Sequence, residues 1–365
     1  MALYIGLTIW FLILSLLGLR PDSIEAAENW PKPPEGKMER MNQIIVFILA
    51  LLSFLLLWFL TAFRSSEIGN DTNNYLYYFD IFTNGIDLTR RAEIGYQFFV
   101  FFIGKFTRDQ HAFLIITASV MYCGIGVYLF KYSKNPAVSL CLFFSFFFSV
   151  YINILRQCMA MMIALYGYQL LKSGKKTLAA LLFLMAMCFH TTAIVCFLLF
   201  LDLKILEKRW VVFSITLLCA AVSFSGILKS VVDVIFPKYS TYFKGQYASS
   251  GWVAVTCYLL VYFALYVLVT KSLIPDCKPD KVVAANFTFL LLLTAFGYAV
   301  NLFERASEYF MLIATVEFPN ILYRGKVKNF RLWVLGICIA FLAMFLVTLI
   351  LRPGWSKMCP YEFWH

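Results

Sequence analysis

The feature that most constrains this chain is a series of about ten apolar stretches, each close to the roughly 20 residues that a helix needs to cross a bilayer. These apolar runs are continuous rather than alternating, which disfavours a membrane β-barrel. The sequence therefore predicts an all-α, polytopic transmembrane protein with about 10–12 membrane segments. The candidate spans are residues 1–19, 44–63, 111–130, 137–154, 157–171, 210–228, 252–270, 282–303, 306–323 and 331–351.

Composition excludes the other broad classes of protein. The chain is 62% hydrophobic and 14% charged, whereas a soluble domain is about 45–50% apolar and about 25% charged. So apolar a chain would collapse rather than remain disordered. The net charge of +11 would suggest nucleic-acid binding in a soluble protein. In a membrane protein, Lys and Arg first mark the cytoplasmic loops, so we expect no nucleic-acid partner.

The positive charges also predict an orientation. Most of the 31 Lys and Arg residues fall in loops that we expect on the cytoplasmic side. These are 20–43, 131–136, 172–176, 204–209, 271–281 and 324–331. The larger outer-face loops are then 64–110 and 229–251. We expect a first span with a Pro-rich loop, residues 1–43, followed by one membrane domain, residues 44–365.

Two apolar stretches do not fit a simple crossing. Residues 94–106 are too short to span and predict a half-span or interfacial helix. Residues 177–203 carry basic clusters on both sides, which conflicts with a single crossing. A re-entrant hairpin with His190 near its tip resolves this conflict, with legs of about 13 residues, roughly 20 Å each. An ordinary tilted span with a Lys-rich loop on each side is the alternative.

The outer-face loop after the second span is rich in polar residues. It offers Arg64, Asp71, Asn73, Asn74 and Tyr75, and Glu93 follows shortly after. Asn, Asp and Tyr suit sugar hydroxyls, which need donors and acceptors beside a flat apolar surface. A solvated loop without a role is the alternative.

Arg156 and Gln157 interrupt the otherwise nearly unbroken apolar run 137–171. The break lies about 15 residues from Lys172, which places Arg156 at the outer interface. A turn whose Arg side chain extends to the surface would also explain the break. His190, at the proposed hairpin tip, would face the same side, although it could equally be a hydrogen-bonded helix histidine.

A further polar group precedes residue 310. Spacings of three and four residues place Arg305, Glu308 and Tyr309 on one helix face. A local Arg305–Glu308 pair is the alternative to a functional role. With Arg64 and Arg156, Arg305 makes three arginines expected at one membrane face. A guanidinium binds phosphate oxygens bidentately and stays charged, which suits a lipid-linked pyrophosphate.

A metal site or cofactor is not expected. The ten cysteines are scattered without a C-x-x-C pair, and most lie within apolar runs as small buried hydrophobes. The chain has only three histidines, which disfavours a His-based metal site.

Several of these residues form an ordered set of motifs that resembles the EpsG family. The motifs are FRSSEIGNDTNNY at 63–75, E-x-G-Y at 93–96, Arg156-Gln157, FHTTAI at 189–194, R-x3-YF at 305–310 and PYEF at 360–363. The family is placed among the Wzy-type polymerases of bacterial exopolysaccharide and O-antigen synthesis. The resemblance covers about residues 44–363.

The resemblance implies a GT-C-like helical fold and a polymerase in the bacterial plasma membrane, with its active site facing outward. Repeat units are built on undecaprenyl pyrophosphate and flipped across the membrane. The growing glycan is then moved from its carrier to the non-reducing end of an incoming lipid-linked unit, without a nucleotide sugar or a metal. A flippase and a chain-length regulator would be partners in the same pathway.

Under this resemblance, the candidate residues take three roles. Arg156 and Arg305, with Arg64 as a third, would stabilise the departing pyrophosphate. The base for the attacking hydroxyl would be His190 first, then Asp71, with Glu93 also a candidate. The sugars would be bound by Asn73, Asn74, Tyr75, Gln157, Glu308 and Tyr309.

Two other functions remain alternatives. An O-antigen ligase-like glycan transferase would use similar chemistry with a different acceptor. A lipid-linked oligosaccharide flippase is expected to show paired halves and charges along a central cavity, whereas this sequence has no internal repeat and its informative charges gather at one face.

Overall fold

The computed structural model describes residues 1–19, 37–86, 92–202, 208–227, 230, 234, 252–272, 281–297, 301–324 and 329–364. Regular structure within these ranges is helical throughout, apart from an isolated β-bridge between Arg64 and Phe363. The helices are α1 (Ala2–Gly18), α2 (Lys37–Ala62), α3 (Thr72–Phe82), α4 (Ile94–Ile103), α5 (Gln110–Tyr132), α6 (Pro136–Asn153), α7 (Leu155–Lys172), α8 (Lys176–Met187), the 3-10 helix η3 (Thr191–Phe200), α9 (Arg209–Phe224), α11 (Trp252–Ser272), α12 (Lys281–Phe296), α13 (Asn301–Arg324), α14 (Phe330–Leu351) and α15 (Pro353–Ser356).

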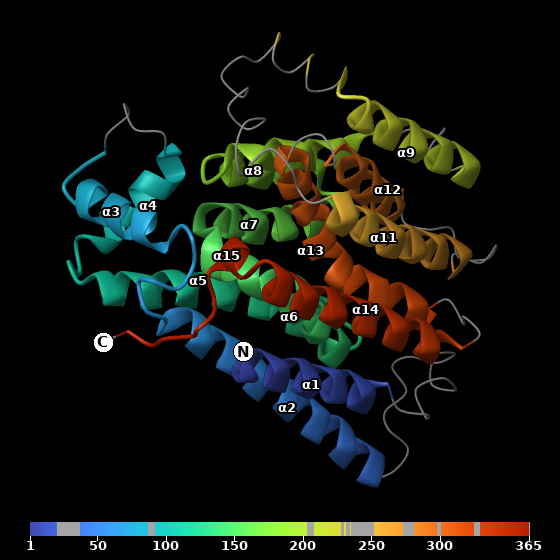
Figure 1. Ribbon diagram of the computed structural model, residues 1–365, viewed down its shortest axis with the longest axis horizontal. Helices are drawn as coiled ribbons and strands as arrows, with labels where there is room; N and C mark the ends of the chain where they lie inside the picture. Colours follow the sequence, from blue (N-terminus) through green and yellow to red (C-terminus); the bar gives the residue numbers. More distant parts are fainter. Residues whose placement is uncertain are drawn as a thin grey trace.

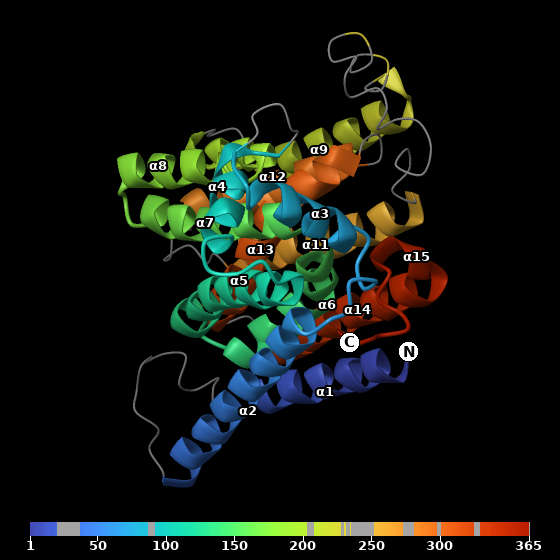
Figure 2. The same ribbon diagram turned by 90° about the vertical axis from the view of Figure 1, so that its left-hand side faces the viewer.

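The helices form one bundle around α6, α7 and α13 (Figure 1). In that view α1 and α2 lie along one side of the bundle, and α8 and α9 lie along the opposite side. The short helices α3 and α4 lie together at one end of the bundle, as the perpendicular view also shows (Figure 2). The all-α polytopic fold predicted from the sequence is confirmed.

Each predicted span coincides with a helix, but the helices differ in length and polarity. Four in the described ranges are long and apolar enough to cross a membrane: Arg40–Ala62, Gln110–Tyr132, Pro136–Asn153 and Arg331–Leu351. Others are shorter, and α9 and α12 are apolar helices of 16 residues each. Helix α13 begins at Asn301, so Arg305 lies within its first turns rather than in the predicted connection between spans. The chain is a multi-helix membrane protein.

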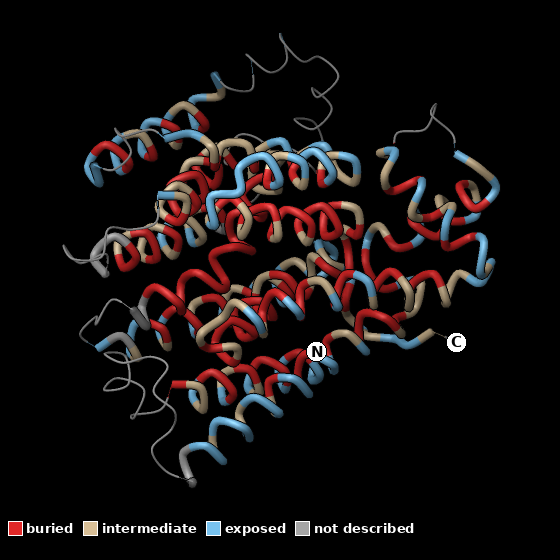
Figure 3. Tube along the Cα trace, turned by 180° about the vertical axis from the view of Figure 1, so that it is seen from behind, coloured by how far each residue is buried: buried red, intermediate tan, exposed pale blue. Residues whose placement is uncertain are grey.

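Burial separates the central helices from those that face outward. Of the apolar stretch that could cross a membrane, 78% is buried in α6, against 33% in α2 and 39% in α14. Figure 3 shows the same contrast between the buried centre of the bundle and its exposed outer segments. Phenylalanines from α6 fill the core, and Phe144 stacks on Phe11 of α1 with ring centroids 4.3 Å apart. The outward apolar side chains of α2 and α14 therefore suit contact with lipid.

Hydrogen bonds between distant segments gather the predicted cytoplasmic connections at one end of the bundle. Asn135 donates its side-chain amide to the Gly18 carbonyl at 2.9 Å. Asn320 donates to the Tyr132 carbonyl at 2.8 Å. The ends of α1, α5 and α13 and the start of α6 are thus tied together.

The opposite end of the bundle, called here the Arg156 end, is closed by the C-terminal segment 356–364. Ser65 donates its backbone N–H to the Glu362 carbonyl at 2.9 Å. Asn153 donates to the Ser356 carbonyl at 3.1 Å, and Tyr4 of α1 donates to the Met358 carbonyl at 2.7 Å. The segment therefore connects α1, α6 and the loop that follows α2.

The hairpin predicted around His190 is present. Helix α8 ends at Met187, the chain reverses, and η3 begins at Thr191. Phe183 of α8 and Phe197 of η3 have ring centroids only 5.7 Å apart, which a continuous helix would place about 21 Å apart. A leg of 12 residues is about 18 Å long and too short to cross the bilayer core.

The first segment predicted at the outer face is partly helical. Residues 64–110 contain two short helices, α3 and α4. Helix α4 has 10 residues, about 15 Å, a length that suits the half-span or interfacial helix predicted for residues 94–106. The other predicted outer loop, 229–251, lies almost wholly outside the described residues, as does most of 20–43.

The ion pair between Lys172 of α7 and Glu317 of α13 offers a test of this packing. The Glu317 side chain is 3% exposed and that of Lys172 is 20% exposed. Removing one partner from a buried pair costs about 3–5 kcal/mol, while replacing both by apolar residues restores much of that stability. We expect Lys172→Met to lower the thermal midpoint in detergent and Lys172→Met/Glu317→Leu to recover most of it. A double variant less stable than the single one would contradict this packing.

Candidate active site at the Arg156 end

Polar side chains from four helix starts meet at the Arg156 end and form what we call the polar cluster. Glu93 precedes α4, Arg156 and Gln157 lie in the first turn of α7, and His190 precedes η3. Thr191 and Thr192 begin η3, and the fourth helix, α13, carries Arg305, Glu308 and Tyr309 within its first nine residues. The members are Glu93, Arg156, Gln157, His190, Thr191, Thr192, Arg305, Glu308 and Tyr309. The N-terminal end of each helix carries the positive end of its dipole, which favours an anion there.

Glu93 joins α7 to the hairpin tip. Its Oε2 accepts from Nη1 of Arg156 at 2.6 Å, and its Oε1 accepts from the backbone N–H of Thr191 at 3.3 Å. The carboxylate is 15% exposed and the guanidinium side chain 22% exposed. The pair is therefore partly shielded from water while one edge of it stays accessible.

The close approach of α4 to the hairpin tip depends on Gly95. Its backbone N–H donates to the Cys188 carbonyl at 2.8 Å. A β-carbon at residue 95 would stand 2.7 Å from that same oxygen, closer than any side chain tolerates. The E-x-G-Y motif thus combines an acid that reaches the cluster with a glycine that allows the approach.

Aromatic rings surround Arg156 on the α3 and α4 side. The guanidinium carbon lies 6.0 Å from the ring centroids of both Tyr78 and Tyr96. The Arg156 guanidinium also donates a hydrogen bond to the Tyr75 hydroxyl. Cation–π contacts of this kind hold a guanidinium in place without neutralising its charge.

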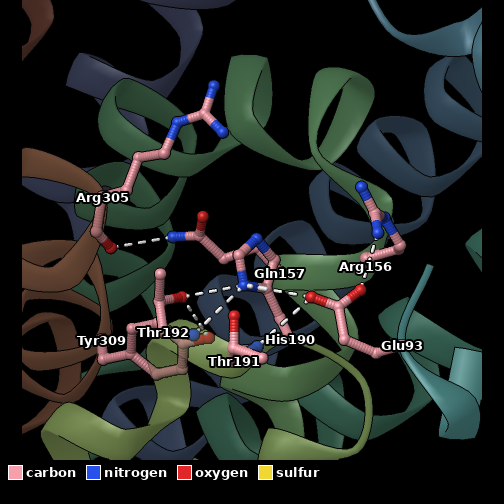
Figure 4. Close-up of polar contacts among 8 residues, drawn as sticks. All are labelled: Glu93, Arg156, Gln157, His190, Thr191, Thr192, Arg305 and Tyr309. Carbon is pink, nitrogen blue, oxygen red and sulfur yellow. Dashed lines mark hydrogen bonds and ion pairs between the residues drawn. The ribbon is translucent and has the colours of Figure 1, made fainter. Parts of the chain in front are cut away.

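Gln157 links α7 to α13. Its Nε2 donates to the Arg305 carbonyl at 2.8 Å and to Oε2 of Glu308 at 2.7 Å. The Glu308 carboxylate is therefore held by Gln157 rather than by the local Arg305 pair considered from the spacing. The Arg305 guanidinium is half-buried and forms no hydrogen bond or ion pair within the described ranges. Figure 4 shows Arg305 and Arg156 on either side of Gln157 and His190.

His190 is connected to α13 through Thr192. The Thr192 hydroxyl lies 3.0 Å from Nδ1 of His190 and 3.2 Å from the Tyr309 hydroxyl. His190 lies between α8 and η3, outside the spanning helices. Burial, followed by the positive charges of Arg156 and Arg305, lowers the pKa of its imidazole well below the usual value. The imidazole is accordingly neutral at physiological pH.

Other predicted residues lie outside these contacts. Asp71 is half-buried at the start of α3, and Asn73 and Asn74 are exposed in the first turn of that helix. Asn73 donates to Oε1 of Glu67 at 3.3 Å. Tyr75 is buried against Arg156 and connects α3 to the polar cluster.

Arg64 is fully buried beneath the C-terminal segment. One of its terminal nitrogens donates to the Thr61 carbonyl at the end of α2. A cation at a helix C-terminus is stabilised by the dipole and by the free carbonyls there. We therefore leave Arg64 out of the polar cluster.

Three residues of the cluster region were not singled out from the sequence. Thr191 and Thr192 belong to the FHTTAI motif, and Gly95 belongs to E-x-G-Y. Their places in these motifs could have drawn attention to them. The chemistry of a glycine or a threonine does not by itself indicate a role in a site until its neighbours are known. The described residues contain no group of three or more His, Cys, Asp or Glu that could hold a metal ion.

Comparison with known protein families identifies the chain. The model of the EpsG family matches residues 47–363, so the chain belongs to the EpsG family, a Wzy-like polymerase family. Comparison with curated proteins and with solved structures gives no match. The resemblance found in the sequence is confirmed, and it supports a general role as a polysaccharide polymerase-like, glycosyltransferase-like membrane protein.

Gly95→Ala tests whether the cluster requires the contact between α4 and the hairpin tip. The added methyl group must displace the Cys188 carbonyl and with it the position of Glu93. We expect a loss of polymer-forming activity of about tenfold or more, since a displacement of about 1 Å can cost 10²-fold.

Gly336→Ala in α14 is the matched control, because a β-carbon there meets nothing within 4 Å. It should leave activity unchanged and gain about 0.5–1 kcal/mol of helix stability. Equal activity of Gly95→Ala and Gly336→Ala in a membrane polymerisation assay would contradict the importance of the contact.

Proposed function

We propose that this protein polymerises lipid-linked oligosaccharide repeat units at the outer face of the bacterial plasma membrane. It moves the growing glycan from undecaprenyl pyrophosphate to the non-reducing end of an incoming unit on the same carrier, without a metal. A flippase would supply the substrate at that face, and a chain-length regulator would act on the product. The proposal includes a GT-C-like relationship for the fold.

The observation that carries this proposal is the placement of Arg156 and Arg305 at converging helix starts, on either side of Gln157 and His190 (Figure 4). Two fixed guanidiniums and the positive ends of helix dipoles suit an anion with several oxygens, such as a pyrophosphate. Most other polar groups of the cluster bond one another, whereas the Arg305 guanidinium has no such partner in the described ranges. The site therefore has a cation ready for a ligand.

The reaction needs one bond to form and one to break. The acceptor hydroxyl oxygen bonds to the anomeric carbon of the donor, and the carbon–oxygen bond to the pyrophosphate breaks. The leaving oxygen takes the electron pair, and negative charge grows on the pyrophosphate. Arg156 and Arg305 stabilise that charge more strongly in the transition state than in the substrate, which is the condition for catalysis.

The hydroxyl proton must pass to a base. Glu93 and His190 lie within the polar cluster, with Nδ1 of His190 3.9 Å from Oε1 of Glu93. Within the described ranges Asp71 forms no hydrogen bond or ion pair with a member of the cluster, so we rank it behind these two. Both Glu93 and His190 are partly exposed, as a group that meets a sugar hydroxyl must be.

The predicted sugar-binding residues fall at two depths. Gln157, Glu308 and Tyr309 are buried at the base of the cluster. Asn73 and Asn74 are exposed on α3, beside the buried Tyr75. We assign the α3 amides to a sugar of the glycan, since amides both donate and accept. The deep group supports the cluster from below, through the bonds of Gln157 to the Arg305 carbonyl and of Tyr309 to Thr192.

Arginine substitutions test the pyrophosphate assignment. Arg156→Ala and Arg305→Ala should each lower the polymerisation rate by about 10²–10³-fold, the loss typical of removing one group that stabilises transition-state charge. Single lipid-linked units should accumulate in cells. Arg108→Ala is the matched control, because Arg108 is bound to Asn84 on the surface outside the cluster.

The discriminating measurement is the chain-length distribution of lipid-linked and free glycan in strains that carry each variant. Normal long polymer from either cluster variant would refute the assignment. Accumulated polymer on the lipid carrier, rather than single units, would indicate a ligase.

Purified protein and a defined undecaprenyl-pyrophosphate-linked repeat unit provide a direct test of metal independence. We expect polymer to form at the same rate with and without a chelator, because the arginines supply the charge that a metal would otherwise supply. A rate that falls with chelator and returns with added Mg²⁺ or Mn²⁺ would overturn the arginine-based mechanism.

A further inference from the structure

The first turn of η3 determines which nitrogen of the His190 imidazole carries the proton. The imidazole serves as the N-terminal cap of this helix, and its Nδ1 accepts from the backbone N–H of Thr192 at 3.3 Å. A backbone N–H can only donate, so the Nδ1 atom must present a lone pair. In a neutral imidazole the proton then resides on Nε2.

The Thr192 hydroxyl supports the same tautomer. It lies 3.0 Å from Nδ1 of His190 and 3.2 Å from the Tyr309 hydroxyl. With Nδ1 as acceptor, the Thr192 hydroxyl donates to His190 and accepts from the Tyr309 hydroxyl. The position of each proton in this series of hydrogen bonds is then determined. The buried Tyr309 thereby holds the ring through Thr192.

The surrounding charges oppose protonation of the ring. The positive charges of Arg156 in α7 and Arg305 in α13 oppose a positive charge on the imidazole, and so does the positive end of the η3 dipole. Glu93, 3.9 Å from Nδ1, is the carboxylate that favours the cation, but it is already paired with Arg156 at 2.6 Å. Tyr309, which reaches the ring through Thr192, is neutral at physiological pH. Protonation at Nδ1 would also break the cap of η3.

We propose that His190 acts as a neutral hydrogen-bond donor through Nε2–H, directed at the oxygens of the departing pyrophosphate, and not as the base. This assignment rests on the proposed function and deepens it. The base is then Glu93: the hydroxyl proton moves to its carboxylate, and the leaving oxygen keeps its electron pair and accepts the Nε2–H bond. Nε2 makes no hydrogen bond within the described ranges, and the His190 side chain is 15% exposed. Nε2 is therefore accessible to a ligand.

Nitrogen NMR reads the tautomer without reference to activity. The full chain, labelled with ¹⁵N-histidine in lipid nanodiscs, carries only three imidazoles. The signal lost in His190→Gln belongs to His190, and His111→Gln, outside the cluster and stacked on Trp364, is the assignment control. We expect Nε2 protonated and Nδ1 unprotonated, with no change between about pH 5 and 8. A protonated Nδ1, or a ring that titrates in that range, would overturn the proposal.

The activities of two His190 variants distinguish a hydrogen-bond donor from a base at this position. Gln places an amide N–H near the position of Nε2 but cannot take up a proton at neutral pH. His190→Ala should lower kcat by about 10²–10³-fold, while His190→Gln should stay within about tenfold of the natural chain, with the same pH profile.

A folded His190→Gln protein as inactive as His190→Ala would overturn the donor role. If the natural chain forms no polymer from the lipid-linked unit, the proposed function fails, while the NMR result still decides the tautomer.

Discussion

The need to satisfy every backbone polar group within the bilayer governs this structure. Helices meet that need, and interruptions are tolerated where protein rather than lipid surrounds them. Three interruptions meet at the Arg156 end: before α4, between α6 and α7, and at the hairpin tip. There Gly95 donates to the Cys188 carbonyl, and Thr191 donates to Glu93. The start of α4 thus bonds the end of α8, and the start of η3 bonds the Glu93 carboxylate. The same arrangement brings the positive dipole ends of α4, α7 and η3 to the region where Arg156 lies.

Two polar links hold α7 against α13, one near each end of α7. Gln157 bonds Glu308 at the Arg156 end, and Lys172 pairs with Glu317 at the other. These two links set the position of α7 along α13. With α13 fixed in this way, Arg305 is held beside the hairpin tip without needing a partner of its own. Rigid support of this kind is what a site needs if it stabilises charge by preorganisation.

Much of the fold could be predicted because hydrophobic length and charge act locally along the chain. Apolar runs predicted the helices, and basic clusters on both sides of 177–203 predicted the hairpin. The interruption at Arg156 predicted an outer end there, and the structure places that residue with Glu93 and His190. Arg64 shows the limit of this reasoning. Its position in the sequence is that of an interfacial cation, yet its side chain is fully buried and its backbone pairs with Phe363 of the C-terminal segment.

The sequence by itself determined that this is a helical membrane protein with motifs of one polymerase family, because composition, span length and motif order need no knowledge of contacts. Only the tertiary structure decided how the polar residues are used. It joined Gln157 to Glu308, and it made Nδ1 of His190 the cap of η3. The physical reason is that hydrogen-bond partners and tautomers depend on groups distant in sequence, which only folding brings within about 3 Å.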